Sequence, residues 1–459
     1  HDTTSPSYYY GRAEKLLEAN DLNPAFYNFH LAAKGFEESG ELKNLIRSLL
    51  QMSDIKRIRQ DFDSTELLLK QSWDVLNEAG KGYEALLADY YLKSGTLKLN
   101  KGLYEEATTF YQKSLQTTLE HSGPGDTTLV MVYNNLGITA YQLGLYEQSL
   151  EYYSKAREII DLGQISKNKH VGFTYQNLGI YYATLGNYEL AGQYFSKTLE
   201  IFSNLFDEND SRLGRYYLNY GRMLLLTGHM EEALSLLKRA ERIIQKNFGP
   251  DYTTIGLIMM NKAAIYTSFS DYERAFNYTN RALAILLKNF PNGHPDILRA
   301  YLNLGHYHEI KENYEGAIEF YKMSIDRDRA VPANIKTYRN MARIFNNQGK
   351  KEEADRYYSL AIDESIRIFG NEHPETAHSY VNYARFLTQH HSYSKSQELL
   401  GRAINIYLKT HGPKHREYSN ALSWLGNNYF EKGEYLNALS EFQRAIIAIS
   451  YNFENTDPF

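Results

Sequence analysis

The hydrophobic and polar positions of this chain repeat with a fixed step along almost its whole length. The clearest mark is a large residue, usually aromatic, that opens the second half of each repeating unit. These opening residues are Phe62, Tyr104, Tyr146, Tyr188, Met230, Tyr272, Tyr314, Lys351, Tyr393 and Tyr435. They follow one another at 42 residues, except for the 37 residues from Tyr314 to Lys351. Self-similarity of this kind fixes the architecture before any local prediction is made.

Small residues recur in the same register and predict two helices in each unit. A Gly or Ala lies midway along the first helix, at Gly95, Gly137, Gly179, Gly221, Ala263, Gly305, Ala342, Ala384 and Gly426. Tyrosines four positions earlier, such as Tyr133 and Tyr301, are predicted to fill the space beside them. A further Gly ends the first helix and suits a left-handed turn, at Gly102, Gly144, Gly186, Gly228, Gly349 and Gly433. We therefore expect helical hairpins that approach closely at the small residues.

These residues resemble the tetratricopeptide repeat (TPR), which has a large residue, Leu and Gly in helix one, then Tyr-x-x-Ala and Ala in helix two. The resemblance covers roughly Pro24 to Ile449. The usual repeat has 34 residues, and the extra residues here follow helix two, as in NFGPDYTT from Asn247. This long form is similar to the repeats of kinesin light chains and of bacterial TPR–CHAT proteins, which carry a caspase-like domain. The resemblance implies an all-α, right-handed α-solenoid superhelix of about ten helical hairpins.

The quality of the repeat divides the chain. We expect a lead at 1–23 with a first helix from Tyr8 to Ala19, degenerate capping units at 24–80, the regular array at 81–450 and a tail at 451–459. The short step near Val331 predicts a kink. The ending AIIAISYNFENTD resembles the phrase that precedes the caspase-like domain in TPR–CHAT proteins, so we expect the tail to be a linker to a missing C-terminal domain. The chain has no Cys, so the activity of that domain is not carried over.

Composition narrows the function classes. The absence of Cys excludes disulfides, thiolate metal sites and a cysteine nucleophile. A net charge of −5 argues against a nucleic-acid partner, and no apolar run is long enough to span a membrane. The chain begins at His1 without Met, which fits either an artificial start or a removed signal peptide. The compartment stays open between the cytoplasm and export.

Candidate chemistry lies on the first helix of each unit, which the resemblance places along the concave groove. An amide recurs two positions before the small residue, at Asn135, Asn177, Asn219, Asn261, Asn303, Asn340 and Asn382. An amide both donates and accepts, so a row of them can pair with the backbone of an extended peptide. The alternative is that each Asn bonds a neighbouring helix.

Other groove positions change along the array. The early units carry apolar residues such as Met131, Ile138, Phe173 and Ile180. The later units carry Arg215, Arg222, Arg299, His306, Lys336, Arg339, Arg343, His378 and Arg385. Guanidinium groups suit carboxylates, so the hypothesis is a guest with an apolar part and an acidic part. The alternative is that these cations are only a solvated helix face.

No pattern indicates catalysis, a metal or a cofactor. His306 and His308 are two apart on a helix and point away from each other, whereas zinc helices use positions i and i+4. We expect a non-enzymatic scaffold that binds a protein or extended peptide, as the recognition part of a TPR–CHAT-type protein. A kinesin-light-chain-like cargo adaptor and a peptide-sensing regulator are the alternatives. The sequence leaves the partner and the oligomeric state open.

Overall fold

The chain is helical throughout the part that the structure describes. The computed structural model describes residues 4–163, 168–185, 187–325 and 332–450. Within these ranges there are 22 helices and no strand. The expected tail at 451–459 and the short junction at Val331 lie outside the described residues.

Two compact units, residues 1–296 and 297–459, share these helices. Unit 1 contains α1 (Pro6–Glu18), α2 (Leu22–Ser39), α3 (Leu42–Ile58), α4 (Phe62–Ala79), α5 (Glu84–Asn100), α6 (Tyr104–Ser122), α7 (Leu129–Gln142), α8 (Tyr146–Leu162), α9 (Lys169–Thr184), α10 (Tyr188–Leu205), α11 (Ser211–Leu226), α12 (Met230–Phe248), α13 (Thr253–Ser268) and α14 (Tyr272–Asn289). Unit 2 contains α15 (Pro295–Ile310), whose first turn crosses the boundary, α16 (Tyr314–Met323), α17 (Pro332–Asn347), α18 (Lys351–Phe369), α19 (Pro374–Gln389), α20 (Tyr393–His411), α21 (Arg416–Lys432) and α22 (Tyr435–Ile449).

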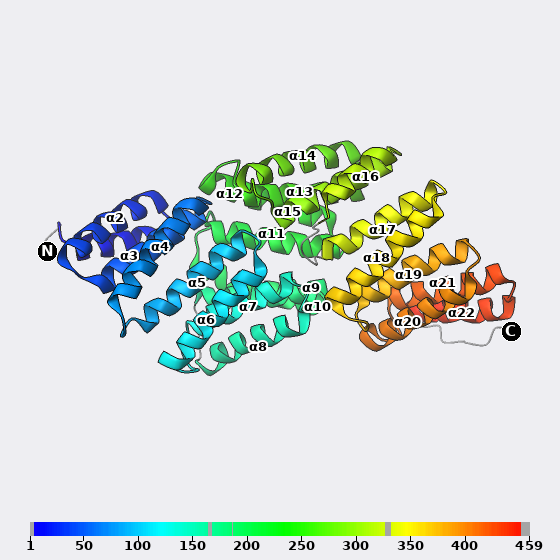
Figure 1. The fold of residues 1–459 in the computed structure, drawn as a ribbon, viewed down its shortest axis with the longest axis horizontal. Helices are drawn as coiled ribbons and strands as arrows, with labels where there is room; N and C mark the ends of the chain where they lie inside the picture. The colour runs from blue at the N-terminus through cyan, green and yellow to red at the C-terminus, as the bar shows by residue number, and fades with distance from the viewer. Residues whose placement is uncertain (1–3, 164–167, 186, 326–331, 451–459) are drawn as a thin grey trace. The chain divides into compact units, whose positions relative to one another are not determined.

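Within each unit, consecutive helices pair into hairpins, and neighbouring hairpins pack on one another. Figure 1 shows this stacking for α5 to α8 in unit 1 and for α17 to α22 in unit 2. The residues that open the second half of each unit in the sequence are the first residues of α4, α6 and every later even-numbered helix. The α-solenoid prediction is therefore confirmed.

Capping side chains explain why several second helices begin where they do. Asn187 precedes α10, and its Oδ1 accepts a hydrogen bond from the backbone N–H of Leu190 at 3.2 Å. Asp271 does the same for Arg274 ahead of α14, at 3.0 Å. Such a side chain satisfies one of the backbone donors that the first turn of a helix leaves unpaired. At α10 and α14 the opening aromatic residue thus follows a local signal that starts the helix.

The mid-helix Gly residues accept a ring from the second helix of the same hairpin. A Cβ added at Gly137 would overlap the ring of Tyr153, and one added at Gly305 would overlap Tyr321. At Gly95 the added Cβ would lie 2.7 Å from Cε1 of Tyr111. Tyr153 and Tyr321 are 3% and 0% exposed, respectively. The close approach that the sequence predicts is present, and the rings that produce it are ones that the pattern did not single out.

The turn inside a hairpin uses the left-handed region of the backbone. Gly144 and Gly349 have φ of 77° and 73° there, as predicted, whereas Gly186 lies outside the described residues. Ser270 and Glu312 occupy the same place with φ of 60° and 58°. A side chain raises the energy of this conformation, so the turn geometry is held by the packing of the hairpin rather than by Gly alone.

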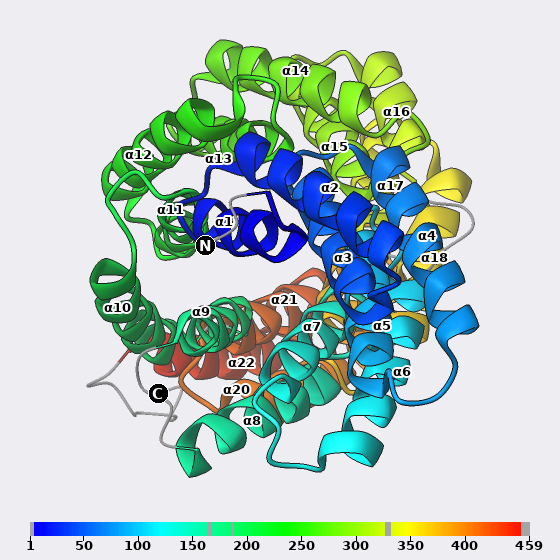
Figure 2. The same cartoon turned by 90° about the vertical axis from the view of Figure 1, so that its left-hand side faces the viewer.

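Unit 1 also joins segments that are far apart in the sequence. Asn20 Nδ2 donates to Asn247 Oδ1 at 3.0 Å, and the Tyr252 hydroxyl donates to the Ile58 carbonyl at 3.0 Å. Figure 2 shows the first helices, in dark blue, beside α12 and α13, in green. The first helix of the chain, α1, starts at Pro6, two residues before the predicted start, and is anchored by Tyr10 against Phe29.

Candidate peptide-binding groove

The asparagine row lies on seven consecutive first helices, the odd-numbered ones from α7 to α19. Six of the seven side chains are half-buried: Asn135, Asn219, Asn261, Asn303, Asn340 and Asn382. Asn177 is buried, with 8% of its surface exposed. Asn382 Nδ2 donates to the His378 carbonyl one turn earlier at 2.8 Å. At this position one donor of the amide is therefore used within its own helix.

A hydrogen bond between neighbouring helices, the alternative to groove contact for the Asn row, is made by a different amide. The neighbour of Asn135, Asn134, is 5% exposed, and its Nδ2 donates to Thr174 Oγ1 on α9 at 2.8 Å. Because Asn134 and Asn135 are adjacent on α7, their side chains leave the helix in different directions. The interhelical bond therefore belongs to Asn134, and Asn135 keeps a partly exposed position.

Most of the predicted cations reach solvent. Arg215 and Arg222 on α11 are exposed, and so are His306, Lys336, Arg343, His378 and Arg385 on α15, α17 and α19. Arg299 and Arg339 are half-buried. The structure thus brings five exposed cationic or imidazole side chains onto three successive first helices of unit 2.

Two of these arginines already have acidic partners within unit 2. Arg343 Nη2 lies 2.8 Å from Glu309 Oε1, and the Tyr321 hydroxyl donates to Glu309 Oε2 at 2.8 Å. Arg339 Nη1 lies 3.5 Å from Glu375 Oε2. Glu309 and Glu375 were absent from the predicted site, although Glu309 lies one helical turn after the mid-helix Gly305, a position that faces the same side. The number of arginines in the sequence therefore overstates the charge that a guest meets.

Three other basic side chains of unit 2 have lowered pKa values. Desolvation lowers the pKa of Lys336, and the nearby Arg339 lowers it further. Desolvation, followed by Arg339, brings the pKa of His378 to about 4. The guanidinium of Arg385 lies 4.2 Å from the ring centre of Trp424, and desolvation lowers its pKa too. Positive charge that is disfavoured in this way is stabilised by an incoming anion.

Unit 1 brings two predicted residues together in a shallow pocket. Asn219 and Arg222 of α11 line it with Ile180 of α9, and Phe195 and Met223 close it. An amide, a guanidinium and an apolar wall meet there, which is the combination predicted for the groove. Met131 and Phe173 of the early units are half-buried.

Charged side chains of α3 and α5 in unit 1 form a cluster that the sequence did not indicate. Lys93 of α5 pairs closely with Asp54 of α3 and lies 3.7 Å from Asp89. Arg57 Nη2 lies 3.0 Å from Asp54 Oδ1. Burial alone would raise the pKa of Asp54, but Lys93 and Arg57 bring it down to about 2. The buried member of this cluster is the cation, since the Lys93 side chain is 11% exposed against 37% for Asp89.

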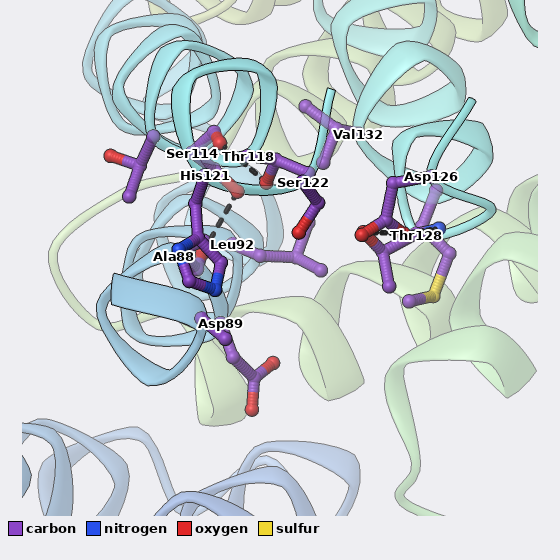
Figure 3. Close-up of a pocket in the computed structure, with 13 residues that line it drawn as sticks. Ala88, Asp89, Leu92, Ser114, Thr118, His121, Ser122, Asp126, Thr128 and Val132 are labelled. Atoms are coloured by element: carbon purple, nitrogen blue, oxygen red, sulfur yellow. Dashed lines mark hydrogen bonds between the residues drawn. The ribbon is translucent and has the colours of Figure 1, made fainter. Parts of the chain in front are cut away.

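A cavity beside this cluster was also missed. It lies between α5, α6 and the start of α7, has a volume of about 140 Å³, and is lined by Ala88, Asp89, Leu92, His121 and Val132 among others (Figure 3). The linker HSGPGDTT runs past it. The only sequence signal was the run of small residues at Ala85 and Ala88, which does not distinguish a cavity from close packing.

Together, the paired helices and the row of side chains on the first helices define an α-solenoid repeat protein with a candidate groove. The family model of the tetratricopeptide repeat matches residues 86–161, 171–246, 254–330, 334–409 and 380–446. The chain therefore belongs to the tetratricopeptide repeat family, whose repeats bind proteins or peptides.

One of the solved structures to which the chain is similar supports the fold. The crystal structure of a Rap protein complexed with competence and sporulation factor is 14% identical, covers 79% of this chain and 98% of its own, and gives a TM-score of 0.58. BtubC (BKLC) from P. vanneervenii is 21% identical over 53% of this chain and 92% of its own, with a TM-score of 0.38. A clustered mitochondria protein homolog of Debaryomyces hansenii is 25% identical over 112 residues, which is 24% of this chain and 8% of that protein.

No helix in the described ranges combines the length and hydropathy that a bilayer crossing requires. In those ranges, no group of three or more His, Asp or Glu side chains is arranged to hold a metal ion.

Proposed function

We propose that the chain is a scaffold that holds an extended protein segment along its first helices, with an acidic part of the segment on α15, α17 and α19. The observation that carries the proposal is the row of exposed Lys336, His378 and Arg385, whose positive forms are disfavoured where they stand. A carboxylate that arrives there can pair with Lys336 or Arg385 and can accept a hydrogen bond from the His378 imidazole, which is neutral near pH 7.

The asparagine row supports an extended guest. Its members stand on successive first helices, and Asn135, Asn219 and Asn303 are half-buried at one position of the repeat. A side-chain amide can donate to a peptide carbonyl and accept from the next peptide N–H. Such contacts fix a peptide backbone without selecting its sequence, so selectivity is left to the charged and apolar positions between them.

A protein partner fits the electrostatics better than a nucleic acid. The net charge of −5 repels a polyanion, and the cations of unit 2 are interleaved with Glu309 and Glu375. A short acidic segment can avoid those carboxylates, whereas a phosphate backbone with one charge on every residue cannot.

The test is the affinity of a labelled Glu-rich peptide of about 12 residues, measured by fluorescence anisotropy. Reversal of Lys336, Arg343 and Arg385 to Glu should weaken binding at least tenfold, or about 1.4 kcal/mol. Arg402→Glu is the matched control, because Arg402 is an exposed arginine on the second helix α20, paired with Glu398. Unchanged affinity in the triple variant, or an equal loss in the control, would refute the proposal, as would equal binding of the Gln-rich counterpart.

A finer assignment rests on the sequence resemblance alone. The array would be the recognition part of a TPR–CHAT-type protein, with a cargo adaptor of the kinesin-light-chain kind as the alternative. The gene sequence that follows the codon for Phe459 tests this directly. A His/Cys pair in a caspase-like domain supports the first assignment, and a coiled coil supports the second.

A further inference from the structure

The cavity between α5, α6 and α7 has walls that act as apolar surface. Ala88, Leu92 and Val132 supply aliphatic groups directly. The hydroxyls in the wall are already used, since Ser114 Oγ donates to the Ala88 carbonyl at 2.8 Å and Thr118 Oγ1 donates to the Ser114 carbonyl at 2.8 Å. A threonine whose hydroxyl is bonded to its own helix presents its methyl group, so the wall offers contact rather than hydrogen bonds.

The size of the cavity selects the group that would fill it. Its volume is about 140 Å³, and a protein cavity of roughly 150 Å³ accepts a benzene ring. An aromatic or branched aliphatic side chain has this size, whereas a lone Ala or Ser side chain would leave most of the space empty.

The rim of the cavity is acidic. Asp89 and Asp126 both line it, with Asp89 on α5, Asp126 in the linker before α7 and His121 near the end of α6 (Figure 3). Asp126 uses Oδ1 to accept from the N–H and the hydroxyl of Thr128, both at 2.8 Å, which fixes its carboxylate at the mouth. Lys93 is the nearest cation to Asp89, and it is shared with Asp54, which it approaches more closely. A second cation would therefore find Asp89 incompletely neutralised.

We infer that this cavity is an anchor site for an aromatic or branched aliphatic side chain of the partner, adjacent to a Lys or Arg that pairs with Asp89 or Asp126. The inference deepens the proposed function, because it assumes a protein guest, and it places an apolar and basic part of that guest on unit 1. The site lies where the long linker after α6 enters α7, a place defined by α5, α6 and α7 alone.

A pair of small probes tests the site without knowledge of the partner. Phenethylammonium carries a ring and a positive charge, and phenylacetate carries the same ring with a negative charge. Saturation-transfer NMR on the full chain should give a dissociation constant on the order of 1 mM for phenethylammonium. Binding of phenylacetate should be at least about tenfold weaker. Equal binding of the two probes, or none by phenethylammonium, would overturn the inference.

Variants locate the binding. Ala85→Phe fills the cavity from an exposed position of α5 and should reduce phenethylammonium binding at least tenfold. Thr109→Phe is its control, since Thr109 is exposed on α6 and does not line the cavity. Asp89→Asn should weaken binding about fivefold and leave benzyl alcohol, a neutral ring probe, unaffected. Retained binding in Ala85→Phe, or an equal loss in Thr109→Phe, would contradict the assignment. None of these measurements involves unit 2, so failure here and failure of the acidic-peptide test are separate results.

Discussion

Each unit contains a charged cluster with one buried member, and the two clusters are built with opposite polarity. In unit 1 the buried member is Lys93, 11% exposed, and the carboxylates of Asp54 and Asp89 lie outside it, at 25% and 37%. In unit 2 the buried member is Glu309, 11% exposed, and Arg343 lies outside it at 50%. A guest meets the outer member, so the same repeat presents negative charge in one region and positive charge in the other.

The second ion pair of unit 2 limits this contrast. Arg339 is 12% exposed and its partner Glu375 is 46% exposed, which is the polarity of unit 1. The positive face of unit 2 therefore depends on Arg343, Lys336 and Arg385, and not on every basic residue of the sequence. The sign of the charge that a guest meets depends on which member of an ion pair is buried. The number of charged residues in the sequence does not show this.

The largest effect is expected from removing the buried cation of unit 1. Lys93→Met leaves Asp54 with Arg57 alone and should lower the free energy of unfolding of unit 1 by about 3 kcal/mol. The pKa of Asp54 is held at about 2, below its ordinary 3.8. The stabilisation it contributes is therefore complete above pH 3.8 and is lost as the pH falls toward 2. In the variant this acid dependence should shrink.

The two tryptophans make this measurement specific to one unit. Trp73 lies on α4 and Trp424 on α21, so urea unfolding of a Trp424→Phe background, followed by fluorescence, reports on unit 1. Lys98→Met is the control on the same helix, because Lys98 pairs with the exposed Glu106 at 2.8 Å. A surface pair of this kind contributes about 1 kcal/mol or less. An equal loss in both variants would show that the buried cluster has no special weight.

A second prediction tests whether the units differ only in charge. Gly137→Ala in unit 1 and Gly305→Ala in unit 2 each place a methyl group against a buried tyrosine ring. Both should lose about 1–3 kcal/mol, since overpacking forces rings and backbone apart. Gly221→Ala is milder, because its Cβ would lie 3.3 Å from Leu237. Urea unfolding followed at Trp73 and at Trp424 separates the units, and a large difference between Gly137→Ala and Gly305→Ala would mean that packing differs as well.

The sequence predicted the helices well because several helical boundaries have a local cause. The opening aromatic residues follow caps such as Asn187 and Asp271, and the small residues mark where helices touch. The rings that meet the small residues were missed, although Tyr153 and Tyr321 stand sixteen positions after Gly137 and Gly305. A turn joins the two helices of a hairpin, and its geometry decides which ring of the second helix contacts the small residue of the first.

The candidate groove was less accessible to sequence reasoning. The Asn row and the exposed cations follow from the repeat register, which places them on the first helices. The pairing of Arg343 with Glu309 depends on side chains 34 positions apart, on different hairpins. The cavity beside Asp89 depends on the path of a linker whose Gly and Pro residues fix no single conformation. The repeat register predicts on which face of a helix a residue lies. The distances between hairpins decide which side chains it contacts on that face.

The smallest expected effect, from Glu309→Gln, addresses the polarity of unit 2 most directly. The substitution keeps an acceptor for the Tyr321 hydroxyl and removes the negative charge that Arg343 now faces. Because the released guanidinium is half-exposed, an acidic peptide should bind about two- to fivefold more tightly, or up to about 1 kcal/mol. Glu375→Gln is the matched control, since its partner Arg339 is only 12% exposed and gains little access to a guest. Anisotropy with the Glu-rich peptide measures both, with urea unfolding at Trp424 to verify that unit 2 stays folded. Tighter binding in Glu309→Gln alone means that the outer member of the pair sets the charge that a guest meets, whereas unchanged or weaker binding would mean that Arg343 serves only the fold.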